Sequence, residues 1–181
     1  MRVISGRYRG RKLREPADNA IRPTTDKVKE SIFNIIQFDI EGREALDLFA
    51  GTGQLGIEAL SRGAKSVLFA DSSPEHVRLV SENLERAGVE TGAQVVRADA
   101  IELLKRGRRF DLVFLDPPYD SDLLDRALAA IFQFDILKDN GIIVCESQTD
   151  KLLPEPPAPY ARYREYRYGR IKITLFVRNA V

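Results

Sequence analysis

The sequence predicts an α/β fold built on a mainly parallel sheet, and two features carry this prediction. Short apolar runs alternate with amphipathic helical segments along most of the chain, which is the pattern of strands joined by crossover helices. The chain closes instead with two strand-like runs around Gly169, typical of a hairpin. A length of 181 residues is enough for one domain, 1–181, with a sizeable core. We expect a basic arm at 1–22 and a core at 23–181.

Seven strands are expected in all. Two of them, 163–168 and 171–177, would place an antiparallel hairpin on an otherwise parallel sheet. The other five have apolar runs that indicate burial on both faces, and they span 45–49, 66–70, 94–98, 110–115 and 141–146.

Helical periodicity fills the segments between these strands. A first helix is expected after the start signal Pro23-Thr24-Thr25, and a second after the capping pair Ser73-Pro74. Their apolar residues recur at helical spacing, and we interpret them as core contacts: Val28, Ile32, Ile35 and Ile36 in the first helix, Val77, Val80, Leu84 and Ala87 in the second, and Leu123, Leu124, Ala127, Leu128 and Ile131 in a later one.

The N-terminal segment is strongly basic. Residues 1–29 contain nine Lys and Arg against three acids, a net charge of +6, so the rest of the chain carries −5. Residues 2–14 are expected to form a small β-hairpin or arm with turns at Gly6 and Gly10. A basic arm on a slightly acidic body indicates an anionic partner, although a solvated terminal segment would have the same composition.

The composition argues against several classes of protein. Cys145 is the only cysteine, so an internal disulfide and a cysteine metal cluster are excluded, and its apolar strand predicts a buried, inert thiol. His76 is the only histidine and is expected on a helix surface, which argues against Ser-His or Cys-His catalysis. No apolar run approaches the ~20 residues of a membrane span, and a reducing cytoplasm fits.

A glycine-rich loop follows the first strand, in the segment LDLFAGTGQLG over residues 46–56. Glycine lets a backbone turn sharply and approach a ligand closely, and Gly51, Gly53 and Gly56 have the G-x-G-x-x-G spacing. Asp71 ends the next strand, 20 residues after Gly51, where a carboxylate can accept hydrogen bonds from a ribose diol. These features fit a dinucleotide dehydrogenase as well as a methyltransferase, and a purely structural turn is less favoured.

Two further carboxylates favour S-adenosylmethionine (SAM) as the ligand. Asp47 lies four residues before Gly51, where it can fix the loop and meet the ammonium group of SAM. Asp99 follows the third strand beside Ala100 and can accept a hydrogen bond from the adenine amino group. Asp99 can equally be the N-cap of a helix over 101–105, and one side chain can serve both roles.

The segment FDLVFLDPPY over residues 110–119 decides the reaction class. Two prolines stiffen the turn after an apolar strand, at the end where open α/β sheets bind ligands. An exocyclic amino nitrogen of a base is a poor nucleophile because its lone pair is delocalised into the ring. The Asp116 carboxylate and the Pro117 carbonyl can each accept a hydrogen bond from one of its two N–H groups. Tyr119 offers a stacking face for a flipped base. The alternative is a rigid turn with a tyrosine at the edge of the core.

With both motifs in place, the chain resembles Rossmann-fold amino-methyltransferases. Two N-terminal segments, RVISGRYRGRKL over 2–13 and RPTTDKVKESIFN over 22–34, resemble the RsmD family, which methylates a guanine N2 in bacterial 16S ribosomal RNA. The resemblance covers nearly the whole chain. It implies a cytoplasmic, monomeric, SAM-dependent enzyme that acts on ribosomal RNA, either free or in an assembling 30S subunit, with no metal and no covalent enzyme intermediate.

The resemblance also implies a role for individual residues. The flipped guanine would be held by Asp116, Pro117, Pro118 and Tyr119. The SAM pocket would be lined by Asp47, Phe49, Ala50, Gly51, Gly53, Asp71, Ser72, Asp99 and Ala100, although Asp71-Ser72 departs mildly from the glutamate common at that strand end. RNA phosphates would be bound by Arg7, Arg9, Arg11, Lys12, Arg22 and Lys27.

Three alternatives stay open at this point. An adenine-N6 methyltransferase acting on DNA or RNA would use the same Asp-Pro-Pro-Tyr turn. An NAD-dependent oxidoreductase would use the glycine loop but leaves that turn unexplained, and a non-catalytic RNA-binding module would need only the arm. The residues themselves lead to an amino nitrogen, and the choice of guanine rests on the N-terminal resemblance.

Overall fold

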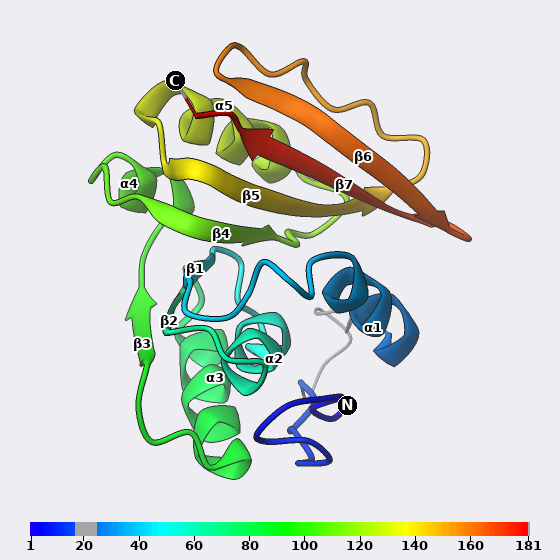
Figure 1. The fold of residues 1–181 in the computed structure, drawn as a ribbon. Helices are drawn as coiled ribbons and strands as arrows, with labels where there is room; N and C mark the ends of the chain where they lie inside the picture. The colour runs from blue at the N-terminus through cyan, green and yellow to red at the C-terminus, as the bar shows by residue number, and fades with distance from the viewer. Residues whose placement is uncertain (17–24, 181) are drawn as a thin grey trace.

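The computed structural model describes residues 1–16 and 25–180. The predicted class is confirmed, because a seven-stranded sheet with the order β3-β2-β1-β4-β5-β7-β6 forms the centre of a mixed α/β fold (Figure 1). The strands from β3 to β5 run parallel, and β7 and β6 pair antiparallel. The elements are α1 (Asp26–Ile35), β1 (Glu44–Asp47), α2 (Gln54–Ser61), β2 (Ser66–Asp71), α3 (Pro74–Ala87), β3 (Ala93–Arg97), α4 (Ala100–Leu104), β4 (Phe110–Leu115), α5 (Leu123–Phe134), β5 (Leu137–Gln148), β6 (Tyr160–Tyr168) and β7 (Ile171–Arg178).

Helices pack on both faces of the sheet (Figure 1). On one face, α1, α2 and α3 contribute Phe33, Ile57 and Val80 to a core cluster. On the other face, α4 and α5 contribute Leu104 and Ile131 to a second cluster. None of the helices in the described part of the chain is long and apolar enough to cross a membrane.

The position of β1 creates the point where a ligand can bind. The chain passes from β1 to β2 and β3 on one side and then returns to β4 on the other side of β1. Leu46 pairs with Val113 and Asp47 with Phe114, so the two strands end side by side. In open α/β sheets, the crevice outside such strand ends is where ligands bind. The glycine loop after β1 and the Asp-Pro-Pro-Tyr turn after β4 therefore flank the same crevice.

The predicted strands are found with two differences. The segment at 94–98 was expected to be buried on both faces, but β3 is largely exposed, because it ends the sheet and has a neighbour on one side only. β5 extends to Leu137–Gln148 rather than 141–146, because it pairs with Phe110 near its start and with Ile171 at its end. α1 begins after its N-cap Thr25, whereas Pro23 and Thr24 lie outside the described residues.

The expected N-terminal hairpin or arm is present as a short antiparallel pairing at Arg2 and Lys12, with backbone hydrogen bonds from Val3 to Arg11 and from Leu13 to Met1. This N-terminal loop also donates hydrogen bonds to α2. The Glu58 carboxylate accepts from the backbone N–H groups of residues 4 and 5 at 2.8 and 3.0 Å. The Ser61 hydroxyl accepts from the N–H of Tyr8 at 2.9 Å. Val3 and Leu13 are buried in the core beneath the loop.

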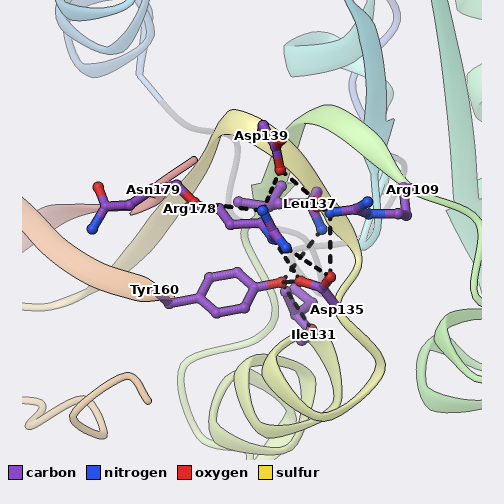
Figure 2. A network of polar contacts seen from close by, with 8 residues as sticks. All are labelled: Arg109, Ile131, Asp135, Leu137, Asp139, Tyr160, Arg178 and Asn179. Atoms are coloured by element: carbon purple, nitrogen blue, oxygen red, sulfur yellow. Dashed lines mark hydrogen bonds and ion pairs between the residues drawn. The ribbon is translucent and has the colours of Figure 1, made fainter. Parts of the chain in front are cut away.

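A polar network connects several elements at the end of the sheet opposite the crevice, where the parallel strands begin (Figure 2). The Arg178 guanidinium, at the end of β7, donates to both oxygens of Asp135 at 2.7 and 3.1 Å and also contacts Asp139. The hydroxyl of Tyr160 donates to Asp135 at 2.9 Å, and Arg109 donates to the Leu137 carbonyl at 2.9 Å. The network joins the end of α5, the starts of β4, β5 and β6 and the end of β7, on the side of the sheet away from the crevice.

Candidate active site

A cleft of about 480 Å³ opens at the carboxyl ends of β1, β2, β4 and β5. It brings together most of the residues that the sequence proposed for the site, although they come from separate strands. Those that line it are Asp47, Phe49, Ala50, Gly51, Asp71, Ser72, Asp116, Pro117, Pro118 and Tyr119. The cleft thus joins the glycine loop and the Asp-Pro-Pro-Tyr turn in one space.

Asp47 lies at the base of the cleft and is only 2% exposed. Its carboxylate accepts a hydrogen bond from the N–H of Gly56 at 3.0 Å, which ties the end of β1 to the first turn of α2. Burial, opposed by the Gly56 hydrogen bond and assisted by the nearby charge of Asp71, raises the pKa of Asp47 to about 7. A cationic group in the cleft would stabilise the ionised carboxylate.

Gln54, the first residue of α2, was not proposed from the sequence but also lines the cleft. It is 6% exposed, and its Oε1 atom is buried without a hydrogen-bond partner among the described residues. A buried acceptor without a donor is costly, so this atom is suited to accept a hydrogen bond from a ligand. Gln54 and Asp47 together give the base of the cleft two acceptors.

Asp71 ends β2 and organises the second wall of the cleft. Its Oδ2 accepts from the N–H of Gly51 at 3.0 Å, and its Oδ1 accepts from the N–H of Ser73 at 2.9 Å. The Nδ1 atom of His76 lies 3.1 Å from the same Oδ1. His76 was expected to be a surface residue, but its side chain is only 28% exposed and it lines the cleft. Its position one turn into α3 brings it back over the end of β2.

The turn after β4 supplies the third wall, and a residue from β5 supports it. The hydroxyl of Tyr119 donates to the Glu146 carboxylate at 2.6 Å. Glu146 is 5% exposed and lines the cleft, as does Gln148. The hydrogen bond anchors the hydroxyl end of the tyrosine, and with it the turn that begins at Asp116. Cys145, one residue before Glu146, is fully buried as predicted, and burial raises the pKa of its thiol.

Three of the proposed cofactor residues do not line the cleft. Gly53 has a left-handed φ of +78°, and a Cβ added there would lie 3.1 Å from the Val80 side chain, so this glycine allows α3 to pack closely. Asp99 is exposed and caps α4 by accepting from the N–H groups of residues 101 and 102 at 2.9 and 3.0 Å. The capping role considered for Asp99 is therefore present, and Ala100 is buried behind it.

The proposed RNA-binding cations lie outside the cleft. Arg7, Arg9, Arg11, Lys12 and Lys27 are exposed, and Arg22 lies outside the described residues. Lys29 contributed to the basic count of this segment but is not a surface charge. It is fully buried, its Nζ donates to the Arg2 carbonyl at 2.5 Å, and Glu58 lies 4.0 Å away. Burial lowers the pKa of Lys29.

Asn83 of α3 connects the N-terminal loop to the glycine loop. Its Oδ1 accepts from the N–H of Arg14 at 2.7 Å, and its Nδ2 donates to the carbonyls of Arg14 and Thr52 at 3.1 and 2.9 Å. The Thr52 hydroxyl also lies 3.5 Å from the sulfur of Met1. Both ends of the basic loop therefore adjoin the wall of the cleft, while its tip rests on Ser61 at the far end of α2.

Comparison with known families assigns the chain to one of them. The family described as "Conserved hypothetical protein 95" matches residues 1–177. The chain belongs to this family. It is 36% identical over 184 residues to the Escherichia coli (strain K12) protein "Ribosomal RNA small subunit methyltransferase D", an alignment that covers 99% of this chain and 91% of that protein. The resemblance to the RsmD family drawn from the two N-terminal segments is thereby confirmed.

Solved structures of related proteins agree with this fold. The Escherichia coli protein yhhF is 33% identical, with a TM-score of 0.88 and coverage of 100% of this chain and 99% of that chain. A T. thermophilus structure described as the 16S rRNA N2 G1207 methyltransferase in complex with AdoMet and guanosine is 21% identical. Its TM-score is 0.72, and the match covers 91% of this chain and 45% of that chain. At this identity the second match speaks for the fold alone.

The sequence missed the cleft residues that depend on strand order. Glu146 and His76 belong to no motif with a recognisable spacing, and Gln54 occupies a variable position of the glycine motif. They reach the cleft because β5 lies beside β4 and because α2 and α3 both start at this edge. One signal was present for Glu146, since it is an acid at the end of the apolar run GIIVC over 141–145. An acid at the carboxyl end of a buried parallel strand faces the ligand edge of the sheet.

Proposed function

We propose that this protein transfers a methyl group from SAM to the exocyclic N2 of a guanine in bacterial small-subunit ribosomal RNA. One observation carries the proposal. The glycine loop and the Asp116–Tyr119 turn line a single cleft at the switch point of the sheet. A glycine loop by itself suits many nucleotide ligands, whereas the second motif in the same space supplies acceptors for an amino group.

The donors and acceptors of the cleft fit SAM. The ammonium group of SAM can be bound by the buried Asp47 carboxylate and by the partnerless Gln54 Oε1. Asp71 lies beside the glycine loop, where its carboxylate can accept from a ribose hydroxyl, and Phe49, Ala50, Gly51 and Ser72 complete this half of the cleft. When bound, SAM supplies an electrophilic methyl group. The proposed adenine contact of Asp99 and Ala100 has no support in the cleft lining.

The chain's own contribution is to orient the base. The Asp116 carboxylate and the Pro117 carbonyl each accept a hydrogen bond from one N–H of the amino group, so that the nitrogen lone pair points out of the base plane. Pro118 keeps the turn rigid. The Tyr119 ring stacks on the base, and its hydrogen bond to Glu146 holds the hydroxyl in place. Holding two reactants in the productive geometry is a large part of the rate enhancement in such a transfer.

Ribosomal RNA as the substrate is supported by family membership and by the exposed cations of the N-terminal loop. The Escherichia coli relative is named as a methyltransferase of small-subunit ribosomal RNA. The choice of guanine N2 rests on the RsmD resemblance. Adenine N6 is the alternative acceptor, since the turn can orient either amino group.

The decisive experiment is a methyl-transfer assay with labelled SAM. Its substrates are 16S ribosomal RNA and 30S particles, both lacking the modification, followed by nuclease digestion and mass spectrometry of the nucleosides. N2-methylguanosine at one position is the expected product. N6-methyladenosine would replace guanine by adenine in the proposal, and no transfer to either substrate, with SAM bound, would overturn it.

A further inference from the structure

The outermost strand of the sheet, β6, has a composition that the cleft does not explain. Over its nine residues, YARYREYRY, tyrosine and arginine alternate with little else. Tyr160 belongs to the network around Asp135, and Arg162 pairs with Glu155, while Arg164 donates to the Tyr166 hydroxyl at 3.3 Å within the strand. Apart from Tyr160 and Arg162, the tyrosines and arginines form what we call the β6 surface, which consists of Tyr163, Arg164, Tyr166, Arg167, Tyr168 and the following Arg170.

The β6 surface is positively charged, and its arginines and Tyr163 are exposed, whereas Tyr166 and Tyr168 are half-buried and pack against the core. Tyr163 is 56% exposed, and the Arg164 guanidinium lies over its ring at 4.9 Å. Arg167 and Arg170 are exposed and form no ion pair with any described residue. The single acid of the strand, Glu165, is already engaged by Lys172 at 3.4 Å and by Arg162 at 3.8 Å. No acid of β6 therefore offsets the charges of Arg164 and Arg167.

Strand register extends this surface to the rim of the cleft. Gln148, which lines the cleft, pairs with Ile171, and Ile171 pairs with Tyr168. Two strand spacings, about 10 Å, separate Tyr168 from the cleft wall. Thr149 fixes the hairpin turn by donating from its N–H to the Arg170 carbonyl and from its hydroxyl to the Gly169 carbonyl, each at 3.0 Å.

Three of the side chains share one face of the strand, whereas Arg167, which pairs with Lys172, lies on the other face. Arg164, Tyr166 and Tyr168 pair with Leu175, Ile173 and Ile171, and side chains two apart lie on the same face. This face also carries α1, α2 and the N-terminal loop. The loop packs over α2, toward the β2 half of the sheet, whereas β6 is the strand at the other end. The cleft at β1 and β4 thus has a cationic surface on each side.

We propose that the β6 surface binds the RNA strand flanking the target nucleotide, on the side of the cleft away from the N-terminal loop. This inference rests on the proposed function. Alternating aromatic rings and guanidinium groups along a groove are the chemistry that binds unpaired nucleotides, because bases stack on rings while cations follow the phosphates. A base flipped into the cleft leaves unstacked neighbours that need such a surface.

The test compares two triple variants with the same loss of charge. R164Q/R167Q/R170Q removes the cations of the β6 surface. R86Q/R106Q/R108Q removes three exposed arginines from the end of α3 and the loop before β4, outside the β6 surface. Tyr163→Ala removes one stacking face without changing the charge. For each protein we would measure affinity for unmodified 16S ribosomal RNA over a range of salt concentrations, SAM affinity and the thermal unfolding midpoint.

The β6 variant is expected to bind RNA at least tenfold more weakly, with a salt slope reduced by about two, as loss of three contacts to single-stranded phosphates predicts. Tyr163→Ala should weaken binding and leave the slope unchanged. The control variant should stay within twofold of the wild type, and SAM affinity should be unchanged in all three.

Equal RNA affinity for the β6 and control variants would overturn this inference while leaving the proposed function intact, provided the wild type still methylates the RNA. Loss of binding to 30S particles alone, with naked RNA bound normally, would overturn it in favour of a protein contact. A wild type that binds RNA through β6 but methylates neither substrate would overturn the proposed function instead.

Discussion

Asp116 is the side chain of the proposed site that contacts the reacting group directly. Its carboxylate must accept a hydrogen bond from the amino group in the same cleft that holds the methyl donor. Asp116→Ala is expected to lower kcat for methyl transfer by at least about 100-fold, the scale seen when one preorganised polar contact to the reacting group is lost. SAM affinity should stay within about twofold, because the proposed SAM contacts belong to other residues. Labelled methyl transfer and calorimetry measure the two quantities.

Asp120→Ala is the matched control, because Asp120 lines the same cleft but lies outside the Asp-Pro-Pro-Tyr motif. It should retain most of the activity. Near-normal turnover in Asp116→Ala, or an equal loss in both variants, would remove the proposed role of Asp116.

Asp47 predicts how SAM binding depends on pH. Its pKa of about 7 means that much of the carboxyl is protonated at pH 6, and a cationic ligand prefers the ionised form. SAM affinity should therefore rise between pH 6 and pH 7.5, by up to about tenfold per pH unit below the pKa. Calorimetry in two buffers of different ionisation enthalpy should show proton release at pH 6 that fades by pH 7.5.

Two variants separate Asp47 from its neighbour. Asp47→Asn removes the titrating group and should flatten the pH profile. His76→Gln replaces the histidine that lines the same cleft, and it should keep the slope. A flat profile for the wild type would contradict the proposed ammonium contact.

The roles of single residues were predictable where the neighbouring sequence forms a motif. Asp47, Gly51 and Asp116 sit in motifs that combine a strand end with glycine or proline, so local chemistry places them at the ligand edge. Glu146 could not be placed in the same way, because its contact with Tyr119 requires β5 to lie beside β4. Gln54 was missed because its unsatisfied oxygen is a property of packing and leaves no trace in spacing.

Among the elements, the N-terminal loop depends on how closely it approaches α2. Gly6 and Gly10 have nearly the same left-handed φ, +81° and +82°. A Cβ at Gly6 would lie 1.8 Å from the Ser61 carbonyl oxygen, whereas one at Gly10 would have nothing within 4 Å. Gly10→Ala should therefore cost only the backbone strain, about 1–2 kcal/mol. Gly6→Ala adds a backbone clash that the loop can relieve only by leaving α2.

Urea unfolding and RNA affinity, measured on both variants, test this difference. Gly6→Ala should have the lower midpoint and the weaker RNA binding, because the loop that carries the cations is displaced. Equal effects of the two substitutions would mean that the close contact between Gly6 and Ser61 does not determine the position of the loop.

The network at the end of the sheet opposite the crevice predicts a separate pH dependence. The hydrogen bonds from Arg178 hold the pKa of the Asp135 carboxyl below its usual range, despite an opposing effect of burial. This stabilisation is present above the unfolded pKa near 4 and is lost as the pH falls through the lower folded value. Asp135→Asn keeps a residue type that tolerates the left-handed φ of +49°.

At pH 7, Asp135→Asn should lower the free energy of unfolding by about 1 kcal/mol, a modest value because the side chain is 44% exposed and screened by solvent. The difference from the wild type should shrink as the pH drops below 4. Asp122→Asn, whose pair with Arg126 at 3.6 Å is more exposed, should change stability by less. A deficit that persists at pH 2.5 would rule out the charge as its cause.

The types and order of the elements were predictable from periodicity, and their edges were not. β4 has the predicted bounds because an apolar run ends at a proline pair. The exposure of β3 and the length of β5 follow from which strands lie beside them, and that information is absent from any single run. The hairpin or arm expected at 2–14 is present, but its attachment to α2 was not predictable, because it depends on the distant Glu58 carboxylate, which accepts hydrogen bonds from the loop.

For the whole molecule, the distribution of charge matters more than its total. The chain has a net charge of only +1, yet Arg7, Arg9, Arg11 and Lys12 are all exposed on one loop. Replacing these four by Gln should weaken RNA binding and lower the salt slope by about three, the value for four contacts to single-stranded phosphates. An unchanged slope, measured by RNA affinity from low to high salt, would exclude the loop from the interface. The division into an arm at 1–22 and a core at 23–181 remains a prediction.

The three hydrogen bonds of Asn83 restrict which amino acids can replace it. Its amide uses the oxygen and the nitrogen together, to Arg14 and to Thr52, within a side chain that is wholly buried. Aspartate would match the shape but bring an acceptor against two carbonyls, leucine would leave all three groups unsatisfied, and glutamine would need an extra methylene in a filled space. Position 83 therefore has no conservative replacement, although it lies outside both motifs and lines no part of the cleft.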